Sequence, residues 1–189
     1  MSRFAPLMTS RANYWGGTAL DLAASIVALV AGFRLGHVAA VLAAALAGLL
    51  WYSLCEYAIH RWLYHTGRNI AAVAHARHHV EPGVVYGPPF YYGVAIAALH
   101  AVLVALPFGA ASGLAFAGAL LLGYVQHGLV HHSAHRYPIL DILGSRSALR
   151  KHHALHHRVG RGNFGVSTMW WDRMFGTLVT TAGERTRPP

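Results

Sequence analysis

The stretch that decides the fold is GTALDLAASIVALVAGF at residues 17–33, followed by HVAAVLAAALAGLLWYSLCEY at residues 37–57. The hydrocarbon core of a bilayer is about 30 Å thick, and roughly 17 to 25 apolar helical residues cross it. Both segments fall in that range. The residues between them, Gly32-Phe-Arg-Leu-Gly36, predict a tight turn. The two segments therefore predict a membrane-spanning helical hairpin.

The rest of the chain contains a second pair of apolar segments. Residues 92–106 are short for a full span, and Pro107 and Gly109 separate them from residues 112–130. This pair either spans the bilayer or dips in and returns. The composition agrees with a membrane protein, since 55% of the 189 residues are hydrophobic and 11% are charged. We expect one all-α integral membrane domain over residues 1–189, with about four transmembrane helices in two hairpins and a cytoplasmic, histidine-rich helical cap.

The charge pattern predicts an orientation and a polar partner. The formal net charge is +9, but no nucleic-acid-binding motif accompanies it, so anionic lipid headgroups are the expected partner. Lys and Arg collect on the cytoplasmic side of short loops. Under the two-hairpin arrangement only Arg34 faces the other side, so both termini are expected in the cytoplasm. The single cysteine, Cys55, excludes a disulfide framework and a thiolate metal cluster.

Clustered histidines are the strongest chemical signal in the sequence. Thirteen of the fifteen lie within residues 60–79, 127–135 and 152–157. Leaving so many buried polar rings without partners would cost roughly 1–3 kcal/mol each, so bound metal explains them better than packing. The four groups read His60-Arg-Trp-Leu-Tyr-His65, His75-Ala-Arg-His78-His79, His127-Gly-Leu-Val-His131-His132 and His152-His153-Ala-Leu-His156-His157.

The spacings within these groups are typical of ligands on helices. Residues three or four apart share a helical face, whereas neighbours diverge by about 100°. In His75-x-x-His78-His79 the three rings can lie within one broad face, and the adjacent pair can reach toward two different ions. His153-x-x-His156-His157 repeats the arrangement, and His127 and His131 form a same-face pair.

The remaining pair, His60 and His65, does not share a face on an ideal helix. Either the helix breaks near Trp62, or the two residues serve different metals. Ten ligands exceed the coordination number of one ion, so we expect two ions with about five imidazoles each. Imidazole suits iron, zinc, copper and nickel. The paired Glu-x-x-His motifs of soluble di-iron bundles and the His-Glu-x-x-His motif of metalloproteases do not occur.

Carboxylates are therefore expected to support the ligands rather than to bind metal. Ligating histidines usually donate their second N–H to a carboxylate or carbonyl, and the acids available for this role, or for interfacial salt bridges instead, are Glu56, Asp141 and Asp172. The lone residues His37 and His100 are expected to be packing or interfacial histidines. His135 and His152 are expected to lie at helix caps near a positively charged surface.

With these histidine groups the sequence resembles the fatty-acid hydroxylase and sterol desaturase superfamily. The resemblance runs from Glu56-Tyr-Ala-Ile-His60-Arg to Trp171-Asp-Arg-Met-Phe-Gly-Thr177, within a histidine-motif core of about residues 52–181. All four histidine groups occur in order. The closest similarity is to the fatty-acid 2-hydroxylases, through His78-His79-x-x-Pro82 and the later Pro88-Pro89.

The resemblance implies a membrane enzyme that uses two iron ions, dioxygen and an external electron donor to hydroxylate a lipid acyl chain; zinc can replace iron in purified protein. Since no cytochrome b5 domain is apparent in the sequence, the donor is expected to be a separate ferredoxin, cytochrome or reductase. No catalytic residue is implied beyond the metal centre. The implied ligands are His60, His65, His75, His78, His79, His127, His131, His153, His156 and His157.

Other functions remain open from the sequence. Carotenoid ring hydroxylation is the main alternative within the superfamily, because those enzymes are similarly small, and sterol oxidation is another. A transition-metal transporter is the alternative outside enzymes. A transport path needs polar groups through the bilayer, whereas these clusters lie at one predicted membrane edge. A haem carrier needs isolated axial histidines on facing helices rather than dense triplets.

Overall fold

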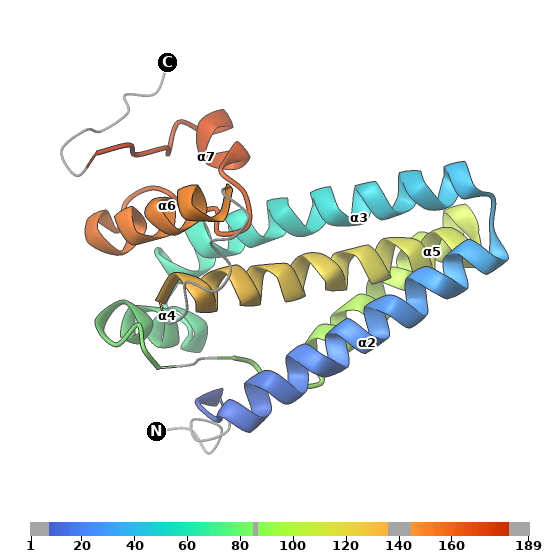
Figure 1. The fold of residues 1–189 in the computed structure, drawn as a ribbon, viewed down its shortest axis with the longest axis horizontal. Helices are drawn as coiled ribbons and strands as arrows, with labels where there is room; N and C mark the ends of the chain where they lie inside the picture. The colour runs from blue at the N-terminus through green and yellow to red at the C-terminus, as the bar shows by residue number, and fades with distance from the viewer. Residues whose placement is uncertain (1–7, 85–86, 136–144, 182–189) are drawn as a thin grey trace. The chain divides into compact units, whose positions relative to one another are not determined.

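The computed structural model describes residues 8–84, 87–135 and 145–181, and these residues contain helices and no strand. This confirms the predicted all-α class. In chain order (Figure 1) the elements are α2 (Arg11–Leu35), α3 (Val38–Ala58), the π-helix η1 (Ile59–Tyr64), α4 (Ile70–Val80), α5 (Tyr92–His135), α6 (Ser145–Val159) and α7 (Trp170–Met174).

The chain divides into two compact units. One, here called the membrane unit, consists of Met1–Tyr52 and Val85–Gln126. The other, the histidine unit, consists of Ser53–Val84 and His127–Pro189. Among the described residues three helices are long and apolar enough to cross a membrane, namely Arg11–Leu35, Val38–Tyr64 and Tyr92–His135. The protein is therefore a multi-pass membrane protein.

The first predicted hairpin forms as expected. Ser10 caps the start of α2, because its side chain accepts a hydrogen bond from the Asn13 N–H. Gly36 ends the helix, and its N–H donates to the Gly32 carbonyl at 3.1 Å. The chain enters α3 two residues later, so the turn is as short as the sequence predicts.

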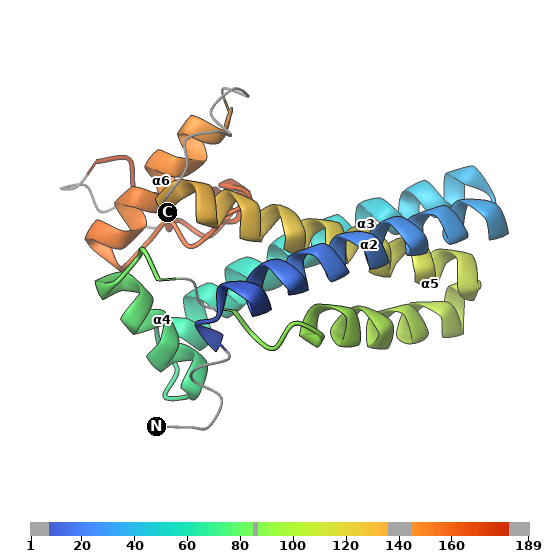
Figure 2. The same cartoon turned by 60° about the horizontal axis from the view of Figure 1, so that its bottom comes forward.

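The third and fourth apolar segments are joined within α5, which bends sharply and folds back (Figure 2). The bend lies at Gly109, where φ is +83°, just after Pro107. Glycine adopts this left-handed backbone without the steric cost that a Cβ would impose. The two arms pack closely, since a Cβ on Gly113 would lie 2.3 Å from the Ala101 carbonyl oxygen. The predicted division at residues 107–109 is therefore a bend between two antiparallel arms.

Small residues let the helices of the membrane unit approach closely. The core of this unit consists of Ala97, Ala117, Leu120 and Leu121. A buried polar contact links α2 to α5, where the Ser25 hydroxyl donates to the Gly118 carbonyl at 2.7 Å. Close backbone approach and such hydrogen bonds stabilise helix pairs in lipid, where no hydrophobic force drives them together.

The close approach of α3 to α5 at Gly48 predicts a large effect for one added methyl group. A Cβ on Gly48 would lie 2.3 Å from the Phe116 carbonyl oxygen, whereas a Cβ on Gly16 meets nothing within 4 Å. We expect Gly48→Ala to destabilise the protein by about 1–3 kcal/mol, the cost of overpacking. Gly16→Ala is the matched control and should leave the thermal unfolding midpoint in detergent unchanged. Equal midpoints for the two variants would contradict this helix packing.

Candidate metal centre

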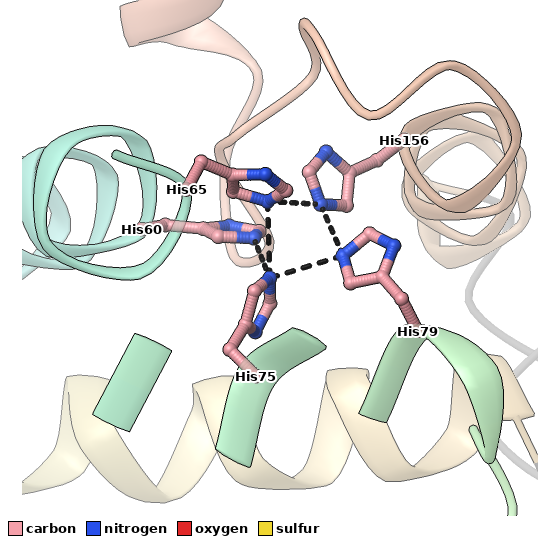
Figure 3. A group of neighbouring side chains, drawn as sticks. All are labelled: His60, His65, His75, His79 and His156. Atoms are coloured by element: carbon pink, nitrogen blue, oxygen red, sulfur yellow. Dashed lines mark hydrogen bonds between the residues drawn. The ribbon is translucent and has the colours of Figure 1, made fainter. Parts of the chain in front are cut away.

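Five histidines from three parts of the histidine unit converge on one point (Figure 3). Two come from η1 and the residue after it, two from α4 and one from α6. Each offers one ring nitrogen, and these nitrogens all lie within 4.8 Å of one another. The first group is His60, His65, His75, His79 and His156.

The π-helix explains how His60 and His65 join the same group. Residues 59–64 have π-helical geometry, with hydrogen bonds five residues apart instead of four. Side chains five apart then lie on one face, which an ideal α-helix would not allow. The sequence left open a helix break near Trp62 or two different metals. The structure shows neither, since the helix continues across Trp62 in π geometry and both residues lie in one group.

The nitrogen spacing of the first group matches a coordination shell. The Nε2 atoms of His65, His156, His79 and His75 form a closed ring with neighbours 3.0 or 3.1 Å apart. His60 Nε2 lies 3.1 Å from His75 Nε2. A metal–nitrogen bond of about 2.1 Å places two ligands at right angles roughly 3.0 Å apart. The ring therefore has the dimensions that an imidazole-bound transition metal requires.

Hydrogen bonds to backbone carbonyls orient two of these rings and leave their Nε2 atoms as the accepting nitrogens. His60 Nδ1 donates to the Phe164 carbonyl at 2.5 Å, and His156 Nδ1 donates to the Gly162 carbonyl at 2.7 Å. In a neutral imidazole the other nitrogen then carries a lone pair. These lone pairs point into the group, where facing lone pairs repel one another. A cation at the centre removes the repulsion, so the donor set fits a metal ion.

A second group of five histidines repeats the arrangement. His153 Nε2 lies 2.9 Å from His135 Nε2 and 3.1 Å from His157 Nε2. His78 Nε2 is buried and has no hydrogen-bond partner. A buried nitrogen without a partner is costly, and a metal ion would satisfy it. The full group is His78, His131, His135, His153 and His157.

Adjacent histidines divide between the two groups. On α4, His79 belongs to the first group and His78 to the second; on α6, His156 belongs to the first and His157 to the second. The sequence predicted that such pairs reach toward two different ions, because neighbours on a helix diverge by about 100°. Each of these helices therefore supplies both groups.

The structure brings together nine of the ten ligands expected from the sequence and places the tenth elsewhere. His127 lies outside both groups, and its Nδ1 is 3.2 Å from Glu56 Oε2. His135, expected to be a cap residue, is in the second group instead. The reason is the length of α5, which continues to His135 instead of ending near residue 130. Both His127 and His135 lie four residues from His131, so the spacing alone does not show which of the two joins it in the second group.

One buried loop, Gly162–Ser167, presents the carbonyls that orient the first group. Asp172 is fully buried and accepts hydrogen bonds from the N–H groups of Phe164 and Gly165, both at 2.8 Å. Asn163 adopts a left-handed backbone with φ of +58°, which Asn tolerates better than most residues. Its side chain bonds the backbone of Val179 at 2.7 and 2.9 Å. No residue pattern indicates these carbonyl acceptors in advance.

The three proposed supporting acids have different surroundings. Glu56 accepts hydrogen bonds from the N–H groups of Val166 and Ser167 at 2.6 and 2.9 Å. Asp172 Oδ2 lies 3.0 Å from Nε2 of His152, a buried residue that was expected at an exposed cap. Asp141 lies outside the described residues. Both described acids therefore hold the loop, and each also faces a histidine that belongs to neither group.

Comparison with known proteins identifies the family. The fatty acid hydroxylase family model matches residues 45–177, which include all ten histidines of the two groups. This chain belongs to the fatty acid hydroxylase family. The resemblance seen in the sequence is thereby confirmed.

This hydroxylase-family chain is similar in sequence to fatty acid 2-hydroxylases from animals and to a plant relative. It is 31% identical over 150 residues to the fatty acid 2-hydroxylase of Rattus norvegicus and 33% identical over 148 residues to that of Macaca fascicularis, covering 70% of this chain and 38% of each relative. It is 29% identical over 142 residues to the dihydroceramide fatty acyl 2-hydroxylase of Arabidopsis thaliana, covering 69% of this chain and 58% of that protein. The chain therefore spans less than two thirds of the length of these relatives.

A solved structure shares the fold of this hydroxylase-family chain. The structure of full-length scs7p, in which only the hydroxylase domain is visible, superposes with a TM-score of 0.73 at 21% sequence identity. The match covers 99% of this chain and 73% of that one.

Burial and mutual repulsion keep the hydroxylase-family histidines neutral. Loss of hydration, followed by the neighbouring imidazoles, lowers the pKa of His75 and His157 to about 2, against an ordinary value of 6.5. Burial likewise lowers the pKa of His78 to about 3 and that of His65 to about 4. Neutral imidazole is the form that binds metal, so these ligands are ready at neutral pH.

These shifts predict an acid-sensitive metal-free protein. Because the folded-state pKa lies below the unfolded value, the unfolded chain takes up protons first as the pH falls. The stabilisation is complete above about pH 6.5 and decreases below it, toward the folded values of about 2 to 4. The thermal unfolding midpoint of the metal-free protein should be level from pH 8 to 7 and should fall steadily from pH 6.5 to 5. A level midpoint down to pH 5 would contradict the burial of these rings.

Proposed function

We propose that this chain is a membrane-bound di-iron monooxygenase that hydroxylates a lipid acyl chain with dioxygen and an external electron donor. The single observation that carries the proposal is the pair of five-histidine groups in a member of the fatty acid hydroxylase family. The relatives are named as fatty acid and dihydroceramide fatty acyl 2-hydroxylases, so we infer carbon 2 of the acyl chain as the site of hydroxylation. The relatives favour neither carotenoid rings nor sterols.

We assign one ion to each group of five imidazoles. Iron is proposed as the native metal because hydroxylation of an unactivated C–H bond needs a redox-active centre, which zinc cannot provide. Bound iron would supply oxygen activation and one-electron chemistry. The ligands of the first ion are His60, His65, His75, His79 and His156, and those of the second are His78, His131, His135, His153 and His157.

The chain's own residues perform binding, orientation and exclusion of water. The Phe164 and Gly162 carbonyls hold His60 and His156 with their lone pairs directed inward. Burial of most of the cluster lowers the local dielectric and keeps water from competing for the ions. The apolar spans place the protein in the bilayer, so we propose that the acyl chain reaches the enzyme from the membrane. Hydroxylation consumes dioxygen, two electrons and two protons, and releases water with the hydroxylated lipid.

Product analysis tests the activity. Iron-loaded protein in vesicles, supplied with dioxygen and a chemically reduced ferredoxin, should convert acyl lipids to 2-hydroxyacyl lipids and leave β-carotene unchanged. Elemental analysis of the same preparation should give close to two metal ions per chain. Hydroxylated β-carotene without hydroxyacyl product, or a reproducible ratio near one ion, would contradict the proposal.

Topology is proposed from the basic residues. Both termini are placed in the cytoplasm, on the side of a soluble electron donor, because nearly all Lys and Arg residues fall on one side of the predicted spans. Reporter fusions at Pro189 and at Gly109 should report opposite sides of the membrane. A C-terminal fusion active only on the outer side would overturn this orientation.

A further inference from the structure

We infer that His127, held by Glu56, is a positioning residue for His131 of the second group and not a metal ligand. The inference rests on the proposed metal centre and deepens it. His127 is four residues from His131, a spacing that suits a ligand equally well. As a positioning residue, it would support the second group in a different way from the carbonyls that orient the first group.

Glu56 is the fixed point of this arrangement. Its side chain is only 2% exposed and accepts hydrogen bonds from two successive backbone N–H groups, those of Val166 and Ser167. The Ser167 hydroxyl also donates to it. Three donors hold the carboxylate in one position, and their dipoles compensate its buried charge.

His127 connects this fixed carboxylate to the second group. Its Nδ1 lies 3.2 Å from Glu56 Oε2, close enough for electrostatic pairing. Its ring stacks on that of His131, with centroids 5.7 Å apart and planes 20° from parallel. The two residues are one helical turn apart on α5, so their side chains share a face. The His127 ring therefore restricts the motion of the His131 ring toward the start of α5.

The same loop thereby supports both groups by different means. Through the Gly162 and Phe164 carbonyls it orients two ligands of the first group directly. Through the N–H groups of Val166 and Ser167 it fixes Glu56, and so His127 and His131. Outer partners of metal ligands typically alter metal affinity roughly 10- to 100-fold, so the His127 contact should be measurable as affinity.

Two substitutions distinguish the effect of the His127 ring from the effect of its pairing with Glu56. His127→Asn keeps an N–H group that can face Glu56 and removes the ring, whereas His127→Phe keeps a ring and removes the pairing nitrogen. Co²⁺ affinity is measured by chelator competition in a double variant, His65→Ala with His75→Ala, that leaves three imidazoles in the first group and all five in the second, so that the tighter site is the second group. We expect His127→Asn to bind Co²⁺ roughly 10-fold more weakly or worse, and His127→Phe, whose ring Glu56 no longer holds, to lie between that variant and the parent.

The crossed background is the control. With His135→Ala and His157→Ala the first group, with all five imidazoles, is the tighter site, and neither replacement of His127 should change the Co²⁺ affinity of that site. Thermal unfolding is followed in parallel. Should His127→Asn fail to fold, Ser167→Ala, which removes one donor to Glu56 without altering α5, should weaken the second group in the same direction.

Three outcomes would contradict the proposed role of His127. Loss of all Co²⁺ binding to the second group in both His127→Asn and His127→Phe would make His127 a ligand, and unchanged affinity in His127→Asn would deny it any role there. Either result overturns the inference and leaves the di-metal proposal intact. Absence of Co²⁺ binding in both backgrounds with His127 intact would contradict the proposed metal centre itself, and the inference would fall with it.

Discussion

Replacing His156 with alanine is expected to remove the first metal ion and abolish hydroxylation. Its Nε2 lies 3.1 Å from the Nε2 atoms of both His65 and His79, so it closes the ring of the first group. It is also fully buried, and its Nδ1 is anchored to the Gly162 carbonyl, so its ring is held in one orientation. We expect a loss of activity greater than roughly 100-fold, exceeding that for outer partners of ligands.

The measurement combines elemental analysis with product formation. The variant should contain close to one ion per chain while the parent contains close to two. His37→Ala, which alters a histidine of the membrane unit far from the groups in sequence, is the control and should retain both ions. An active His156→Ala variant with two ions would show that this ring is not a ligand.

Replacing His135 with alanine is expected to remove the second ion, although the sequence alone predicts a variant with normal metal content. The ring of His135 lies close to those of the four other members of the second group. The centroid distances are 4.8 Å to His78, 5.1 Å to His131, 4.9 Å to His153 and 4.6 Å to His157. Its Nε2 is 2.9 Å from His153 Nε2. We expect the stoichiometry to fall from two ions to one, with loss of hydroxylation.

His132→Ala is the control for this second variant, since it lies in the same stretch of α5 but in neither group. It should keep two ions and most of the activity. If His132→Ala lost an ion and His135→Ala did not, the rotational register of α5 in the histidine unit would be incorrect.

The fold could be predicted from the sequence because membrane spans depend on a simple physical requirement. Long apolar segments at residues 17–33 and 37–57 had to be helical, since lipid offers no other partner for backbone N–H and C=O groups. The bend at Gly109 was predicted from Pro107 and the glycine. The extent of α5 was missed, although Pro138 stands three residues beyond its last residue, His135, and a proline in that position is a signal that a helix has ended.

The candidate site was predictable where helical spacing alone decides which side chains converge. This holds for residues 75–79 and 153–157, whose spacing admits one arrangement. It does not hold for His131, because His127 and His135 both lie four residues from it and either could share its face. The pairing of His60 with His65 depends on a π-helix, which ordinary propensities do not signal. The carbonyls of Gly162 and Phe164 depend on loop conformation, and backbone acceptors have no sequence signature.

The division of neighbouring histidines between the two groups has a consequence for the rigidity of the centre. Because His78 and His79 are consecutive, and His156 and His157 likewise, one covalent step of about 3.8 Å between Cα atoms links the two groups on each helix. A displacement of α4 or of α6 would therefore move ligands of both groups at once. If each group holds an ion, we expect heating to release the two ions together, when α4 or α6 unwinds.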